Sequence, residues 1–370
     1  MMKAIYVVSH CDASGPINQA LNILLGMKAN GRVDDTLVVI DSSEGNNNWL
    51  YRFKENGIQI IELGVKKRYN IISPIKKLRR YVNENDINVV HSSGFRANLI
   101  SLLAARKRCL VVSTIRSEPI AISEKLPKIL RPLFTRLCIK LIKSIPVPVA
   151  CSNAMASQYK SLYGIHMECV QNGVNTDYFK PASYQTKLDL RKKYGFGNDL
   201  IYLVLGILAE RKNNTTIIDA FKKIDDFNGI LVFVGDGPQA ELLRKMASGY
   251  KNIIFHGPTS TPLDFLQMSD FLISASLAEG LPNTVLEAIS CGLIPILSDI
   301  EPHLEIVDDM PIKHIFQRES STELQRLLKE SPQWDIEIQS KNSREVAHGF
   351  GVRNLAEKYE AIYSKKACNV

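Results

Sequence analysis

No stretch of this sequence is apolar for long enough to cross a bilayer as a helix. The longest apolar run lies around Leu203–Leu208, whereas a transmembrane helix needs about 20 such residues. The opening residues, MMKAIYVVSHCDASG, hold an apolar stretch shorter than the core of a secretory signal. We therefore expect a cytoplasmic protein whose first apolar segment is a buried strand.

Paired cysteines are missing as well. The seven cysteines are scattered along the chain and form no C-x-x-C pair. Zinc cages and disulfide frameworks require close, paired spacing. Their absence predicts buried free thiols and argues against a small disulfide-stapled fold.

Acidic residues are scarce in the first half of the chain. Residues 1–170 carry 24 Lys and Arg against 12 Asp and Glu, residues 171–370 carry 22 against 26, and the net charge is +8. Two tracts without an acidic residue, Val65–Asn83 and Lys125–Lys143, hold much of the excess. This imbalance indicates that the first half meets a polyanion. The cations of the two tracts are Lys66, Lys67, Arg68, Lys76, Lys77, Arg79, Arg80, Lys125, Lys128, Arg131, Arg136, Lys140 and Lys143.

The second basic tract interleaves its cations with leucine, isoleucine and phenylalanine. This pattern is typical of an amphipathic helix that lies on an anionic membrane. A solvated helix face, with Lys and Arg stems over the core, is the alternative. Pro127 and Pro132 also argue against one continuous helix. No motif that reads DNA or RNA is present, so a nucleic-acid partner is not expected.

Composition and the order of apolar segments predict a two-domain α/β protein. The 370 residues are 45% hydrophobic and 23% charged, which is ordinary for about two globular domains. Short apolar strands alternate with helical segments, which predicts parallel sheets covered by helices. The expected strands are Lys3–Ser9, Thr36–Ile40, Gln59–Glu62, Ile87–His91, Leu110–Ile115, Pro148–Cys151, Leu200–Leu205, Ile230–Val234, Asn252–Phe255, Phe271–Ser274 and Ile294–Leu297.

The turn-rich segment QNGVNTDYFKP separates two runs of alternating elements. We expect one doubly wound, Rossmann-like domain over residues 1–170 and a second over residues 171–350. A further helix is expected within residues 351–370. Ligands of doubly wound sheets bind at the carboxyl ends of the strands, so the site is expected in a cleft between the two lobes.

One loop of the second lobe carries adjacent cations. The segment GILAERKN begins at Gly206 and places Arg211 and Lys212 between an expected strand and a helix. Two cations there can clamp a diphosphate, although such pairs are often plain surface charge.

A second loop, in the segment AEGLPNTVLEAISCGLIP, leads into a helix. Free N–H groups at the start of a helix attract an anion. Thr284 and Glu287 have the spacing of a capping box, with Asn283 or Thr284 as the N-cap. Glu279 precedes the helix and is expected either to point into the cleft or to be an exposed loop acid.

The eight-residue separation of Glu279 and Glu287 resembles the E-x7-E signature of the retaining glycosyltransferases of family 4, which have the two-lobed GT-B fold. The segment EGLPNTVLEAISCGLIPI resembles that signature almost residue for residue. GILAERKN resembles the phosphate-clamp segment of the family, NGVNTDYF its inter-lobe segment and GDGP its second-lobe turn. VVHSSGFRANLISLLAAR resembles its first-lobe loop, with a sugar-contacting histidine.

The resemblance implies a role for each matching residue. Arg211 and Lys212 would hold the diphosphate of a nucleotide-sugar, and Glu279 would bind hydroxyls of the transferred sugar. His91 would contact the sugar from the first lobe. The other donor-binding residues that it implies are Gly15, Gly206, His256, Gly280, Leu281, Asn283, Thr284 and Glu287, the last at the ribose.

The resemblance also implies an activity: transfer of a sugar, with retention, from a UDP- or GDP-sugar to a glycan or lipid-linked acceptor. Assembly of lipopolysaccharide, capsule or exopolysaccharide suits such an enzyme, peripherally attached to the inner face of the cytoplasmic membrane through its basic first lobe. The C-terminal helix would cross back to that lobe. Because a cation pair and a helix terminus can stabilise the departing diphosphate, and no D-x-D tract has a suitable context, we expect neither a metal nor another cofactor.

Other functions fit parts of the sequence. Residues 235–240, GDGPQA, match a dinucleotide fingerprint, but the acidic residue expected about 20 residues later is missing. A non-hydrolysing sugar-nucleotide epimerase shares the two-lobed architecture. A catalytically silent subunit that binds a nucleotide-sugar is the third alternative.

Overall fold

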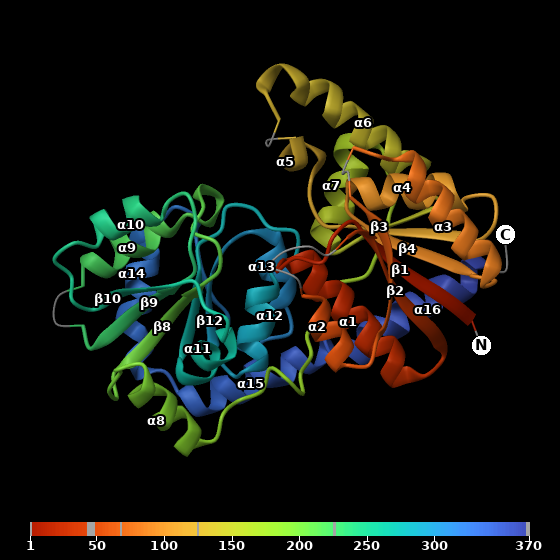
Figure 1. Cartoon of the computed structure of the whole chain (residues 1–370). Coiled ribbons are helices and arrows are strands. Elements are labelled where there is room, and N and C mark those ends of the chain that lie inside the picture. Colours follow the sequence, from red (N-terminus) through yellow and green to blue (C-terminus); the bar gives the residue numbers. More distant parts are fainter. Residues whose placement is uncertain (1, 43–48, 67–68, 124–125, 225–226, 368–370) are drawn as a thin grey trace. The chain divides into compact units, whose positions relative to one another are not determined.

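The computed structural model describes residues 2–42, 49–66, 69–123, 126–224 and 227–367 (Figure 1). The chain forms two compact units, one made of residues up to Gly173 together with the segment from Val352, the other of Val174–Gly351. Lys67, Arg68, Lys125, the Asp225-Asp226 pair and Cys368 lie outside the described residues. The six other cysteines are free thiols.

The first unit holds a parallel seven-stranded sheet with the order β3-β2-β1-β4-β5-β6-β7. Ile5 of the central strand pairs with Thr36 on one side and with Val90 on the other. The elements are β1 (Met2–Val8), α1 (Gly15–Asn30), β2 (Val33–Asp41), α2 (Leu50–Glu55), β3 (Gln59–Val65), α3 (Ile72–Glu84), β4 (Val89–Ser93), α4 (Phe95–Ala105), β5 (Leu110–Ile115), α5 (Pro119–Ser123), the short 3-10 helix η1 (Lys128–Leu130), α6 (Arg131–Ser144), β6 (Val147–Ala150), α7 (Asn153–Tyr163), β7 (Glu168–Cys169) and α16 (Val352–Ala367).

The second unit holds a parallel six-stranded sheet with the order β10-β9-β8-β11-β12-β13. Tyr202 pairs with Leu231 and Phe271 on its two sides. The elements are α8 (Tyr184–Lys193), β8 (Leu200–Leu205), the 3-10 helix η2 (Glu210–Lys212), α9 (Asn214–Lys222), β9 (Gly229–Val234), α10 (Ala240–Met246), β10 (Ile253–Gly257), α11 (Pro262–Met268), β11 (Phe271–Ser274), α12 (Asn283–Ser290), β12 (Ile294–Ser298), α13 (Glu301–Ile306), β13 (His314–Phe316), α14 (Ser321–Glu330), the 3-10 helix η3 (Ser331–Gln333) and α15 (Ile336–Gly349).

Both sheets are doubly wound, which confirms the predicted α/β class. In each, the strand order reverses beside the first strand, between β1 and β4 and between β8 and β11. Loops that leave the sheet at such a point open a crevice at its carboxyl edge. The reversal point therefore marks the edge of each sheet where a ligand is expected to bind.

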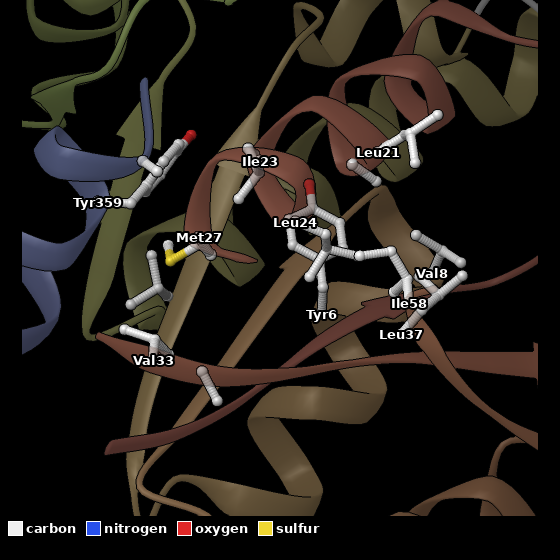
Figure 2. Close-up of a cluster of buried hydrophobic side chains, with 14 of the residues drawn as sticks. Tyr6, Val8, Leu21, Ile23, Leu24, Met27, Val33, Leu37, Ile58 and Tyr359 are labelled. Atoms are coloured by element: carbon white, nitrogen blue, oxygen red, sulfur yellow. The ribbon is translucent and has the colours of Figure 1, made fainter. Parts of the chain in front are cut away.

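Helices α1 and α16 cover one face of the first sheet, although more than 300 residues separate them. Figure 2 shows side chains of α1 and Tyr359 of α16 in the same buried cluster as Tyr6 of β1. The two helices approach so closely that a Cβ on Gly26 would lie 2.0 Å from the carbonyl oxygen of Val352. A glycine is therefore required at this contact.

The second basic tract forms two helical pieces. Pro127 precedes η1, and Pro132 lies in the first turn of α6, where a proline needs no hydrogen-bond donor. The prolines thus divide the tract, as expected, but Pro132 begins a long helix. Within the part of the chain that the structure describes, no helix is both long and apolar enough to span a membrane.

Candidate active site

Two loops meet at the carboxyl edge of the second sheet, beside its reversal point. One follows β8 and contains Arg211 and Lys212; the other follows β11 and contains Glu279. The backbone N–H of Leu277 donates a 2.8 Å hydrogen bond to the carbonyl of Arg211 and so ties the loops together. Residues 68 positions apart in sequence therefore share one small cluster.

Glu279 lies between the two cations. Its Oε1 is 2.6 Å from Lys212 Nζ, and its Oε2 is 3.1 Å from Arg211 Nη1. The Ser276 hydroxyl also donates to Oε1, at 2.9 Å. The Glu279 side chain is 10% exposed and Lys212 is 17% exposed, whereas Arg211 is 52% exposed. Lys212 is thus fixed at the base of the cluster, and Arg211 can turn toward a ligand.

The cations keep Glu279 ionised. Burial alone would raise its pKa, but the charges of Lys212 and Arg211 and the hydrogen bonds from Lys212 and Ser276 outweigh burial, so the pKa lies below its ordinary value. At neutral pH the cluster therefore holds one carboxylate and two cations, with a surplus of one positive charge.

Glycine allows the β8 loop to lie against the neighbouring turn. Gly206 has φ +130° and Gly235 φ +141°, values that favour glycine. A Cβ on Gly235 would lie 1.9 Å from the Gly206 carbonyl oxygen, and one on Gly237 would lie 2.4 Å from that of Leu208. The GDGP turn thus packs directly against the loop that carries the cations. Close packing against this loop thus explains both glycines of the turn, and no bound dinucleotide is needed to explain them.

Helix α12 begins beside this cluster, but without the predicted capping box. The N-cap position is Pro282, which makes no side-chain capping hydrogen bond. Asn283 and Thr284 are its first two residues, so neither is the N-cap. Pro282 has no side-chain acceptor for the N–H groups of the first turn. The partial positive charge at the start of the helix therefore faces the loop. Gly280 and the buried Leu281 belong to the loop that precedes it.

Glu287 lies one turn further along α12 than the residues at its start. Burial and then the Glu287 charge raise the pKa of Cys291 to about 12, which places the carboxylate near that thiol. His256 is exposed at the end of β10, with its ring centroid 4.5 Å from Phe265 and 5.7 Å from Tyr194. The ring thus stands on an aromatic support at the same carboxyl edge of the sheet.

A buried histidine that the sequence reasoning missed lies behind Glu279. His303 of α13 approaches the Ser274 hydroxyl at 3.2 Å and the Ser298 hydroxyl at 3.1 Å. Ser298 donates to the carbonyl of Ser276, whose own hydroxyl donates to Glu279. Burial lowers the pKa of His303 to about 4, so the ring is neutral. This support could have been recognised in the sequence from the serines of SASLAEG and from Ser298 and His303 of SDIEPH.

His91 of β4 lies in the core of the first unit. The ring is 1% exposed, its Nδ1 lies 2.7 Å from the Tyr363 hydroxyl and its Nε2 lies 2.7 Å from Thr114 Oγ1. Burial, and then the Arg116 charge, hold its pKa well below the ordinary value. Both nitrogens thus have partners inside the core of the first unit, and contact between His91 and a sugar stays a prediction. Gly15 is exposed as the first residue of α1.

The acidic pair Asp308-Asp309 lies shortly after α13. Asp308 pairs with Lys313 at 3.1 Å and is 83% exposed. Within the described ranges, no group of three or more His, Cys, Asp or Glu side chains is arranged to hold a metal ion.

Comparison with known proteins agrees with this fold. Residues 41–178 match the family described as Glycosyltransferase Family 4, and residues 186–331 match Glycosyl transferases group 1. HepE of Anabaena, solved in complex with UDP-glucose, superposes with a TM-score of 0.81 at 16% identity, over 98% of this chain and 100% of that chain.

Several of the curated relatives come from Escherichia coli. UDP-Gal:alpha-D-GlcNAc-diphosphoundecaprenol alpha-1,3-galactosyltransferase is 27% identical over 57% of this chain and 57% of its own. The O-antigen biosynthesis glycosyltransferase WclY is 22% identical over 98% of each chain. For three of the curated relatives that it matches, the chain spans less than two thirds of their length, from 38% to 65%.

The fold and these matches define a glycosyltransferase of the GT-B type, within transferase class EC 2.4. The chain belongs to glycosyltransferase group 1/family 4.

Proposed function

We propose that this protein transfers a sugar, with retention, from a UDP- or GDP-sugar to a glycan or lipid-linked acceptor during assembly of a bacterial surface polysaccharide. The observation that carries the proposal is the cluster of Arg211, Lys212 and Glu279 beside the reversal point of the second sheet. It combines two cations for a diphosphate with one carboxylate for sugar hydroxyls.

The donor diphosphate binds to Arg211, Lys212 and the start of α12. A charge-assisted hydrogen bond contributes about 1.5–3 kcal/mol, so two cations anchor the group firmly. Lys212 has three donors and serves Glu279 and a phosphate oxygen together, whereas the exposed Arg211 exchanges Glu279 for the phosphate. Glycines Gly206 and Gly280 let the backbone approach the donor.

Glu279 then receives the hydroxyls of the transferred sugar. Its ionised oxygens accept hydrogen bonds and do not donate them, which suits a carboxylate that orients a polyol. Because Lys212, Arg211 and Ser276 already engage it, Glu279 is a poor nucleophile. Glu287 binds the ribose and His256 lies against the base.

The transfer step proceeds on one face of the sugar. The acceptor hydroxyl forms the new bond to the anomeric carbon as the bond to the diphosphate oxygen breaks. The leaving phosphate takes the acceptor's proton, so retention needs no glycosyl-enzyme adduct. The fixed cations and the helix terminus stabilise the charge that develops on the leaving diphosphate. This electrostatic arrangement performs the task of a divalent metal, and we expect catalysis without one.

The relatives support the donor and acceptor classes. One E. coli relative is named for a UDP-galactose donor and a diphosphoundecaprenol acceptor, the other for O-antigen biosynthesis. Neither a sugar-nucleotide epimerase nor a silent subunit draws support from a specific feature of the site.

Peripheral attachment to an anionic membrane is the last part of the proposal. In η1 and α6 the described cations Lys128, Arg136, Lys140 and Lys143 are exposed, and the tract contains no acid. Such a surface is attracted to anionic lipids, where a lipid-linked acceptor resides.

Turnover with a panel of UDP- and GDP-sugars and a lipid-diphosphate acceptor tests the proposal. We expect one donor to be consumed with release of its nucleoside diphosphate, NMR of the product to show the donor's anomeric configuration, and excess chelator to leave the rate unchanged. An inverted product, reversible loss of activity with chelator, or epimerised donor without transfer would contradict the corresponding part.

A further inference from the structure

The first unit contains a mostly apolar cavity that none of the roles above uses. Its volume is about 200 Å³, larger than the ~150 Å³ apolar cavity that binds benzene in an engineered protein. It opens at the carboxyl ends of β4 and β5, against α5 and α6. The apolar lining residues are Pro16, Phe95, Ile115, Ile122, Leu141 and Ile142.

The cavity lies where the fold would place a substrate of the first unit. Pro16 lies in the first turn of α1, the helix that comes after β1. Ser93 ends β4 and Gly94 follows it, so the cavity borders the strand-order reversal of this sheet. Ligands of doubly wound sheets bind at that point. The location favours a substrate pocket over a packing defect.

One end of the cavity is cationic. Arg116, which follows β5, lines it. Its Nη1 donates to Asn172 Oδ1, but its buried Nε has no hydrogen-bond partner among the described residues. An unpaired buried donor is costly. An anionic group in the cavity beside Arg116 would satisfy it.

The outer face of the same helical segment is apolar and unpaired. Ile129, Leu133 and Leu137 stand four residues apart and are 87%, 68% and 50% exposed. Cys138, Leu141 and Ile142, by contrast, turn inward to the cavity. Helix α6 thus separates an internal apolar pocket from an external apolar row. Helices α5 and α6 are labelled in Figure 1.

Charge decides what covers the outer row. Exposed lysines and arginines flank it, and residues 126–144 contain no acid. Lysine is depleted at the core of protein interfaces, and two copies of this face would repel each other. An anionic lipid surface complements it in both charge and polarity.

We propose that the cavity binds the first part of the apolar chain of a phosphate-linked lipid acceptor, with the phosphate at Arg116. This deepens the proposed function, on which it rests, by giving the acceptor chain a site of its own. The chain passes from the lipid surface at the outer row of α6 into the pocket. The pocket therefore selects acceptors by the chain next to the phosphate as well as by their sugar.

A series of short, soluble probes tests this: inorganic diphosphate and isopentenyl, geranyl and farnesyl diphosphate, each titrated calorimetrically after the Arg211 and Lys212 site has been saturated with UDP or GDP. Because each buried methylene contributes about 0.8 kcal/mol, we expect geranyl diphosphate to bind at least about 10-fold more tightly than isopentenyl diphosphate. Leu141→Trp fills the pocket and should remove this dependence while sparing inorganic diphosphate. Arg116→Met should weaken all the diphosphates.

Matched variants keep the result interpretable. Leu137→Trp adds the same side chain to the exposed face of α6 and should preserve the chain-length dependence. If Leu141→Trp does not fold, Ile122→Trp on α5 fills the pocket from its other wall. Equal affinity for every probe, or unchanged chain-length dependence when a folded variant fills the pocket, would overturn the proposal.

Two further measurements separate the possible failures. UDP and GDP binding is recorded on the same samples, because loss of nucleotide binding contradicts the proposed function, whereas loss of chain-length dependence alone contradicts the pocket. Sedimentation velocity is the other. A wild-type dimer that Leu133→Glu converts to monomer would show that a second copy covers the outer row, and would overturn the lipid path.

Discussion

Glu279 combines two tasks that its environment keeps compatible. Its oxygens hold Arg211 and Lys212 in place, and the same cations hold its pKa below the ordinary value. In the proposed reaction, a donor diphosphate competes with Glu279 for Arg211, while the sugar needs Glu279 as a hydrogen-bond acceptor. Removing the Glu279 charge should therefore leave nucleoside diphosphate binding as tight or tighter and should impair binding of the sugar.

We predict that Glu279→Gln binds free UDP or GDP at least as tightly as the wild type, because a competitor for the cations is removed. Turnover should fall about 100- to 1000-fold, the usual loss when one preorganised polar group of an active site is removed. Calorimetry and steady-state kinetics measure the two effects. Weaker nucleotide binding with normal turnover would show that Glu279 does not orient the sugar.

His303 supports Glu279 through serines without touching a substrate. Its folded pKa of about 4 lies below the ordinary value of 6.5. Stability from the neutral ring is fully present above pH 6.5 and is lost as the pH falls toward 4, at most about 3 kcal/mol.

We predict that His303→Gln flattens stability between pH 6.5 and 4, lowers kcat several-fold and leaves the KM for the donor nearly unchanged. His314→Gln is the control, because His314 is also buried, with a lowered pKa, but bonds Gln339 on α15. It should flatten stability without lowering kcat. Equal losses of kcat in both variants would show that His303 contributes only to packing and does not position Glu279.

Residue patterns predicted the loop chemistry better than the contacts of single side chains. Arg211, Lys212 and Glu279 were all expected in loops that follow strands of the second lobe. The structure shows that these strands, β8 and β11, are neighbours in the sheet. The environment of His91 could not be predicted, because its partner Tyr363 is 272 residues away. Spacing likewise suggested a capping box at Thr284, whereas Pro282 sets where the helix begins.

At the level of elements, buried central strands were the most predictable. Leu200–Leu205, Leu110–Ile115 and Phe271–Ser274 have the expected bounds, since their apolar runs end at turn residues. Helices such as α3 and α14 were not assigned individually from the pattern, because half-polar segments acquire their partner face only through packing. Pro132 shows the same limit: its position in the first turn depends on where α6 begins.

The contact between α1 and α16 gives a prediction at this scale. Gly26→Ala gains about 1 kcal/mol in helix propensity, but its Cβ would meet the Val352 carbonyl at 2.0 Å. Overpacking costs about 1–3 kcal/mol or more, and a backbone atom cannot rotate away. We expect a lower urea midpoint, with net destabilisation of about 1–2 kcal/mol.

The control for that variant is Gly197→Ala, where a Cβ meets nothing within 4 Å. It should change stability by less than about 0.5 kcal/mol. If Gly26→Ala is as stable as Gly197→Ala, the two helices do not pack as closely as the structure shows.

At the scale of the whole molecule, charge is divided between the two halves of the chain. The first half carries the excess of cations, and the second is mildly acidic. The sequence revealed this division, but it could not show which basic side chains stay exposed. Arg131, for example, turns its Nε to the Leu126 carbonyl, whereas Lys128, Arg136 and Lys140 face solvent.

We predict that the triple change Lys128→Glu, Arg136→Glu and Lys140→Glu abolishes binding to vesicles of phosphatidylcholine and phosphatidylglycerol. Lost attraction of about 1 kcal/mol per cation should lower the partition coefficient at least 100-fold. Reversal of the exposed Lys192, Lys245 and Lys329 in the second unit is the control. Cosedimentation measures both, and equal binding of wild type and triple variant would exclude this face.

The proposed function depends most directly on the cation pair Arg211 and Lys212. Calorimetry of UDP, GDP, ADP and NAD with the wild type and with Arg211→Ala/Lys212→Ala tests it. We predict that one nucleoside diphosphate binds, and that the variant binds it about 100-fold more weakly, since two charge-assisted contacts are lost. Binding of NAD alone, or equal affinity in the variant, would contradict both the site and the reaction.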